Sequence, residues 1–166
     1  PKQAPYGYLE QEAGKAKNLK LYVRRVFISD EFDDLLPRYL AFVKGVVDSD
    51  TLPLNVSREM LQQTPALRAI KRQITKKILS ELDTLATEEV AQYETFWKEF
   101  GRCFKEGAGE DHANRERIAK LLRFASTHAD TEAQEVSLAD YVARMKPEQE
   151  KIYYVTAETF AAAKNS

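Results

Sequence analysis

A regular apolar repeat in the middle of the chain constrains its fold more than any other feature of the sequence. Between residues 67 and 85, leucine and isoleucine recur every three or four positions, which places them on one side of an α-helix: Leu67, Ile70, Ile74, Ile78, Leu82 and Leu85. Thr64 and Pro65 precede the repeat and are typical of an N-cap and a first helical residue. The pattern predicts a long amphipathic helix through Ala86, with one side buried against other elements.

Strand patterns precede this helix, after a loop-like stretch over residues 1–17. We predict a strand over residues 19–28, with a bulge at Arg24 and Arg25. A solvated strand face is the favoured interpretation of these two arginines, and a phosphate-binding role is the alternative. The strand ends in a run expected to be buried: Val26, Phe27 and Ile28. A short helix over residues 35–42 and a second strand over residues 43–47 follow, so we predict an α/β (α+β) fold with a helix-covered sheet.

A second helix is predicted over residues 87–105, with Thr87 as its N-cap and Gly107 and Gly109 as its stop. One side of this helix is rich in aromatic residues: Val90, Tyr93, Phe96, Trp97, Phe100 and Phe104. Core packing between helices is the favoured interpretation, and a groove that binds peptide clients is the alternative. Burial of Phe96 and Trp97 would exclude the groove.

Shorter elements are expected in the last third of the chain. Helices are predicted over residues 111–122, 137–144 and 156–164, the last of them capped by Thr156. A brief apolar run over residues 152–155 predicts a strand. The sequence does not begin with Met, and we expect a fragment of a longer protein.

Charge gives no sign of a nucleic-acid or membrane partner. The chain has 25 Lys and Arg against 26 Asp and Glu, so no overall field attracts an anionic partner. The polar side of the long helix is basic: Arg68, Lys71, Arg72, Lys76 and Lys77. No aromatic residues are interleaved with these cations, and a solvated or domain-docking side is the favoured interpretation.

The residues that carry chemistry do not form a self-contained active site in the sequence. Cys103 is the single cysteine, which excludes an internal disulfide and fits a reducing cytosol. His112 and His128 lie in different segments, and no metal-ligand spacing, phosphate-binding loop or nucleophile elbow is present. Of the 166 residues, 43% are apolar and 31% charged, which is typical of one soluble domain.

The segment just before the long helix, residues 50–63, holds a cation in an unfavourable place. Asn55 and Ser57 are both candidates for capping a helix that begins here, and Glu59 then lies near the positive end of its dipole. Arg58 opposes that dipole, at a cost of up to ~1 kcal/mol. On local chemistry alone, a surface arginine paired with a nearby carboxylate is the favoured interpretation of Arg58, and an anion outside the helix is the alternative.

Several separated motifs resemble one chaperone family. LPLNVSREMLQQ at residues 52–63 resembles a signature of the ninety-kilodalton heat-shock proteins (heat shock protein 90). The similarity extends almost without a break over residues 19–59. Residues 118–128, IAKLLRFASTH, and residues 150–166, EKIYYVTAETFAAAKNS, resemble its bacterial branch, HtpG.

The resemblance implies a role in a split ATPase. ATP and Mg²⁺ would bind to a separate N-terminal domain absent from this chain, so the fragment alone is expected to bind no cofactor and to have no activity. Arg58 would contact the γ-phosphate as the catalytic residue, supported by Asn55 and Gln62. The chain is expected to be the central part of the middle domain: the end of a large αβα subdomain over residues 1–86, a helical linker over 87–128, and the start of a small αβα subdomain over 129–166.

The partners implied by the resemblance are proteins. They are the N-terminal ATPase domain, unfolded or partly folded clients, and a second copy held through an absent C-terminal domain. The family resemblance also implies a cytoplasmic stress-response chaperone. The alternative is a client-binding module without a direct catalytic role.

Overall fold

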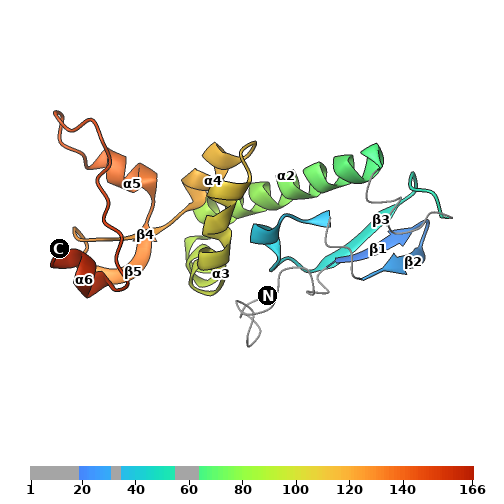
Figure 1. Cartoon of the computed structure of the whole chain (residues 1–166), viewed down its shortest axis with the longest axis horizontal. Coiled ribbons are helices and arrows are strands. Elements are labelled where there is room, and N and C mark those ends of the chain that lie inside the picture. The colour runs from blue at the N-terminus through green and yellow to red at the C-terminus, as the bar shows by residue number, and fades with distance from the viewer. Residues whose placement is uncertain (1–18, 31–34, 55–63) are drawn as a thin grey trace.

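The computed structural model describes residues 19–30, 35–54 and 64–166 of the chain. The molecule is elongated, with a sheet at one end, long helices in the middle, and a second small sheet with short helices at the other end (Figure 1). This mixture of helices and small sheets confirms the predicted α/β (α+β) class.

The sheet near the N-terminus has the strand order β2-β1-β3. β1 (Leu19–Val23) pairs antiparallel with β2 (Val26–Ser29) and parallel with β3 (Gly45–Ser49). The 3-10 helix η2 (Arg38–Leu40) lies between β2 and β3, within the predicted helix over residues 35–42. Side chains of β1 alternate between the core and the surface as predicted, because successive residues of a strand point to opposite faces.

The predicted single strand over residues 19–28 is a hairpin. Arg24 and Arg25 form its turn with φ angles of 49° and 65°, and β2 therefore runs back along β1. The predicted bulge at the two arginines is wrong, and the register of the pair shifts instead between Leu21 and Tyr22. The two adjacent arginines interrupt the alternation of apolar and polar residues in β1. Either a bulge or a hairpin turn gives such an interruption, so the local sequence pattern could not distinguish the two.

Residues 26–28, at the end of this hairpin, were predicted to be buried but are only partly buried. Val26 and Phe27 are 50% and 52% exposed, because β2 is an edge strand of the described sheet. Ile28 is half-buried and packs against the apolar cluster under the sheet. The ring of Phe27 meets the ring of Tyr22 edge-on, at 5.5 Å between centroids.

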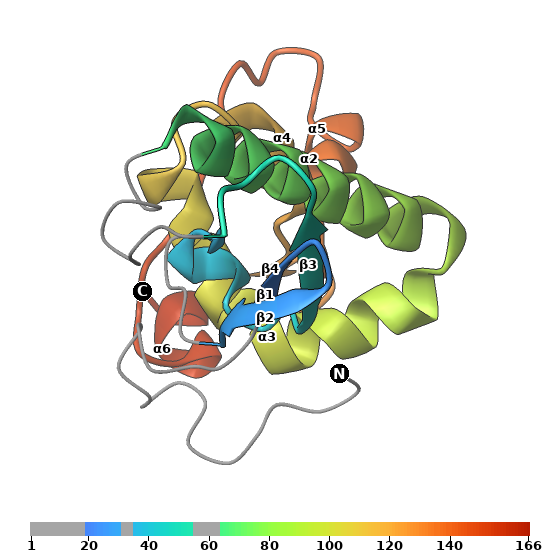
Figure 2. The same ribbon diagram turned by 90° about the vertical axis from the view of Figure 1, so that its right-hand side faces the viewer.

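Helix α2 (Pro65–Glu88) confirms the strongest sequence prediction. The side-chain oxygen of Thr64 accepts a hydrogen bond from the N–H of Leu67 at 3.2 Å, and Pro65 takes the first turn. The N-terminal part of α2 lies over one face of the sheet (Figures 1 and 2). One long helix thus joins the sheet to the helices that follow.

Helix α3 (Val90–Glu110) begins later and ends later than predicted. Thr87 is not its N-cap, because the Thr87 hydroxyl donates to the carbonyl of Asp83 at 2.9 Å within α2. Gly107 and Gly109 do not stop the helix. A helical glycine costs only about 1 kcal/mol relative to alanine, and packing decides in favour of continuation.

The chain then forms α4 (Arg115–Leu121) and an unexpected hairpin, β4 (Phe124–Ser126) and β5 (Thr131–Val136). Helix α5 (Leu138–Ala143) follows as predicted, with a capping box in which the side chains of Ser137 and Asp140 each bind the backbone N–H of the other. These local bonds explain why the sequence located α5 well.

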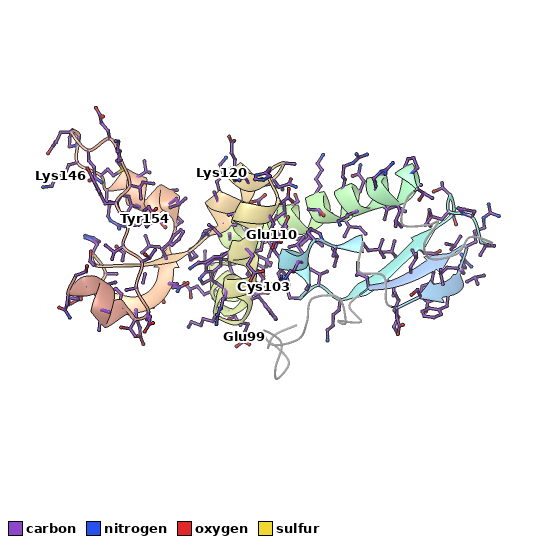
Figure 3. All side chains as sticks on the ribbon, in the orientation of Figure 1. Glu99, Cys103, Glu110, Lys120, Lys146 and Tyr154 are labelled. Atoms are coloured by element: carbon purple, nitrogen blue, oxygen red, sulfur yellow. The ribbon has the colours of Figure 1, made fainter. Side chains whose placement is uncertain are left out.

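The last predicted elements are partly wrong. Residues 152–155 form no strand, and Tyr153 and Tyr154 are 72% and 84% exposed (Tyr154 is marked in Figure 3). The neighbouring described segments offer this run no paired strand, and a strand needs one to satisfy its backbone. Helix α6 (Phe160–Lys164) is capped by Thr159 and not by Thr156.

Two apolar clusters lie under the described elements, and α2 contributes to both. The first lies beneath the sheet and contains Leu19, Leu21, Val23, Leu35, Leu52 and Leu67. The second joins η2 to the helices and includes Tyr39, Leu79, Leu82, Tyr93, Trp97 and Phe104. The division of the chain at residues 86 and 128 stays a prediction.

Candidate functional site

The residues predicted to act on a phosphate lie outside the described part of the chain. Asn55, Arg58 and Gln62 all belong to residues 55–63, which the structure does not describe. The structure does describe the residues on both sides of this segment, which fix the positions of its two ends.

The upstream flank is held by a buried serine. Ser49 ends β3, and its Oγ accepts hydrogen bonds from the backbone N–H groups of Thr51 and Leu52, both at 3.3 Å. Leu52 is fully buried in the cluster beneath the sheet. The chain therefore turns sharply after β3 and is anchored three residues before Asn55.

The downstream flank is held by the N-cap of α2. Thr64 binds the N–H of Leu67, and the Leu67 side chain is buried in the same cluster as Leu52. Both ends of the undescribed segment are thus fixed to one apolar cluster under one sheet. Such rigid flanks suit a segment that presents side chains to a partner.

The anchoring role of Ser49 was not predicted from the sequence. The run Ser49, Asp50 and Thr51 after a strand is a turn signal, because short polar side chains bind nearby backbone groups. That signal could have indicated the anchor.

The aromatic side of α3 is a core and not a groove. Trp97 is 5% exposed, and Tyr93, Phe100 and Phe104 are also buried. The ring of Phe96 is covered by Phe42, Phe100 and Phe104, with centroids 5.1, 5.9 and 6.0 Å away. Core packing is confirmed for the buried rings, whereas Phe96 is half-buried and Val90, on the same side, is 53% exposed. The buried Trp97 is not accessible to a client.

The other candidate side chains have structural contacts. The sulfur of Cys103 lies 3.7 Å from the carbonyl oxygen of Arg38, where α3 meets η2 (Figure 3). His112 is hydrogen-bonded to Arg115, and the backbone N–H of His128 donates to Oγ of Ser126 at 3.3 Å. Among the described residues, no three His, Cys, Asp or Glu side chains come together as a metal site.

Shifted pKa values in the described part also arise from packing. Burial raises the pKa of Tyr39 and of Tyr93, whose hydroxyls donate to Asp111 and to the Leu121 carbonyl respectively. Burial lowers the pKa of Lys105, whose ammonium lies 5.4 Å from the Trp97 ring centroid. The Lys105 ammonium also donates to Oε1 of Gln134 in β5 at 2.8 Å, so these groups join the helices to one another and to the second hairpin.

Within residues 19–30, 35–54 and 64–166, no helix is both long enough and apolar enough to cross a membrane.

Comparison with known proteins identifies the family. The family described as "Hsp90 protein" matches residues 1–166. Chaperone protein HtpG of Burkholderia ambifaria is 68% identical over 152 residues, which are 89% of this chain and 24% of that protein. The HtpG of Burkholderia cenocepacia is 67% identical over the same lengths. The chain thus spans about a quarter of the length of these curated relatives.

A solved structure agrees with the sequence relatives. The middle domain of a heat-shock protein of Plasmodium falciparum is 30% identical and superposes with a TM-score of 0.84, covering 100% of this chain and 63% of that one. The resemblance stated from the motifs is confirmed by these matches. This chain belongs to the Hsp90 family, and its fold is that of the family's middle domain.

Proposed function

We propose that this chain serves an HtpG-type ATP-dependent chaperone by docking on a separate ATPase domain and bringing Arg58 to the γ-phosphate of ATP. The observation that carries the proposal is the motif LPLNVSREMLQQ on a segment whose two flanks are anchored to one cluster. Asn55 and Gln62 assist Arg58 from the same segment.

The chemistry of arginine suits this role. Its guanidinium is permanently charged and forked, so it stabilises charge that develops on the phosphoryl oxygens during transfer. In this proposal, nucleotide and Mg²⁺ bind to the separate ATPase domain, as the family resemblance implies. When bound there, Mg²⁺-ATP supplies the phosphoryl group, and this chain supplies one cation to it.

The edge of the sheet supports the docking part of the proposal. Val26 and Phe27 are large apolar residues on the exposed strand β2, next to the hairpin turn that contacts the end of β3. Apolar side chains at a sheet edge are a common contact surface between domains. We assign this edge to contact with the ATPase domain.

Two assays test the proposal. The isolated chain should show no saturable ATP binding by calorimetry at micromolar concentration, and no hydrolysis. Addition of the matching N-terminal domain should raise ATP turnover above that of either part, and Phe27→Ser should reduce the gain. Tight ATP binding by the isolated chain, or turnover that is the same with and without it, would contradict the proposal.

Client binding is the second candidate function. It is favoured by the exposure of Tyr153 and Tyr154, since apolar surface left in water attracts unfolded segments. The assay is suppression of client aggregation by the chain and by Tyr153→Ser/Tyr154→Ser, and equal suppression would exclude this surface. Cytoplasmic location, a stress response and dimerisation through another domain belong to the proposal by family relationship.

A further inference from the structure

The turn between β1 and β2 has an unfavourable sequence for its conformation. Arg24 and Arg25 both have left-handed backbone angles, with φ of 49° and 65°. A side chain opposes this region, and two-residue hairpin turns therefore favour asparagine and glycine. Two arginines kept in such a place suggest that the turn has contacts that offset the strain.

Within the described ranges, three hydrogen bonds join this turn to the end of β3. The N–H of Arg24 donates to the carbonyl of Ser49 at 3.1 Å, and its guanidinium Nε donates to the carbonyl of Asp50 at 3.3 Å. The N–H of Arg25 donates to Oδ1 of Asp48 at 3.2 Å. Three successive residues of β3 and its exit are thus bound from one turn, because Val23 pairs in parallel with Ser49.

The two arginines differ in what their side chains contribute. Arg25 uses its backbone N–H, which any residue except proline would provide. Arg24 also uses its side chain, whose Nε donates to the carbonyl of Asp50, the first residue beyond the strand. Asp50 lies directly between the buried Ser49 and the turn that leads to Leu52.

We infer that Arg24 is a positioning residue for the segment that carries Arg58. Its guanidinium donates to the carbonyl of Asp50, and the chain from Asp50 through Leu54 leads into that segment. The inference rests on the proposed function, since the start of that segment affects a reaction only if Arg58 takes part in one. Arg24 itself touches no substrate in this scheme.

Arg24→Gly and Arg25→Gly form a matched pair for the test. Both are exposed, both have positive φ, and glycine fits either position without strain. Both variants keep the backbone N–H donors, and only Arg24→Gly loses the bond to Asp50. Each variant is made in the isolated chain and in the full-length chaperone, alongside Arg58→Ala.

Two readouts separate positioning from other roles. In the isolated chain, hydrogen exchange at the amides of Thr51 and Leu52 should be about fivefold faster in Arg24→Gly than in Arg25→Gly, as expected for loss of one charged hydrogen bond near the surface. In the chaperone, Arg24→Gly should lower kcat by about three- to tenfold with KM for ATP unchanged, because a misplaced group slows chemistry without weakening binding. Arg25→Gly should match the parent protein in both.

The outcomes distinguish the inference from the function on which it rests. Equal exchange in the two glycine variants, or equal kcat in both, overturns the inference. A raised KM with unchanged kcat in Arg24→Gly also overturns it, and indicates direct contact with a phosphate. Unchanged turnover in Arg58→Ala refutes the proposed function separately, whatever the exchange measurement gives.

Discussion

Gly107 gives the sharpest test of how α3 packs on η2. A methyl group built on Gly107 would lie 2.6 Å from Cδ2 and 2.7 Å from Cγ of Tyr39. The Tyr39 ring has no room to move, because it is fully buried, donates its hydroxyl hydrogen bond to Asp111 at 2.7 Å, and meets Phe104 edge-on at 5.9 Å. Gly107→Ala must therefore displace a ring that is held at several points.

Two effects of opposite sign contribute to the change in the free energy of unfolding caused by Gly107→Ala. Overpacking of a well-filled core costs about 1–3 kcal/mol, and the fixed ring favours the upper part of that range. Alanine gains back about 1 kcal/mol of helix propensity. Gly109→Ala is the matched control, because no other group lies within 4 Å of its added methyl group. It should stabilise α3 by up to ~1 kcal/mol, and the two variants should differ by about 2–3 kcal/mol.

Urea unfolding followed by circular dichroism measures this difference. Trp97 is the sole tryptophan and contacts the same core, so its fluorescence provides a second probe. Tyr39→Leu combined with Gly107→Ala should recover part of the loss, since the smaller side chain leaves room for the methyl group. Equal stability of Gly107→Ala and Gly109→Ala would refute the argument that glycine is kept in α3 for the Tyr39 ring.

Three further predictions concern the role of Arg58, stability at acid pH and self-association of the isolated chain. Arg58→Ala in the full-length chaperone should keep ATP affinity and lower kcat by about 10³-fold, and Arg58→Lys should not restore kcat fully. Turnover equal to that of the parent protein, with native circular dichroism, would show that Arg58 is a surface arginine. Burial acts to raise the pKa of Asp111, but hydrogen bonds from Asn114 and Tyr39 outweigh burial and lower the pKa. The contribution of Asp111 to stability is therefore present above about pH 4 and is lost as the pH falls further. Asp111→Asn should make stability depend less on pH in this acid range, and an unchanged dependence would contradict the prediction. The exposed run at residues 152–155 should make the isolated chain self-associate, so sedimentation should show less association for Tyr154→Lys, and a strict monomer in the parent chain would contradict this.

Local chemistry determined the parts of this protein that depend on residues close in sequence. The apolar repeat and the Thr64 cap located α2, and Ser137 with Asp140 located α5, because helix hydrogen bonds and caps join residues three or four apart. The motif over residues 52–63 indicated the family that the comparisons then confirmed. The roles of Asn55, Arg58 and Gln62 stay predictions, since these residues lie outside the described ranges.

Tertiary structure decided what depends on distant partners. The sequence predicts Gly107 as the end of a helix. In the structure it lies inside α3, against the ring of Tyr39, which is 68 positions earlier in the chain. Residues 152–155 have a strand pattern and yet form no strand, since a strand is stable only where a second one supplies its hydrogen bonds. The bond from Arg24 to Asp50 spans 26 positions, and only the parallel pairing of β1 with β3 brings its two ends together.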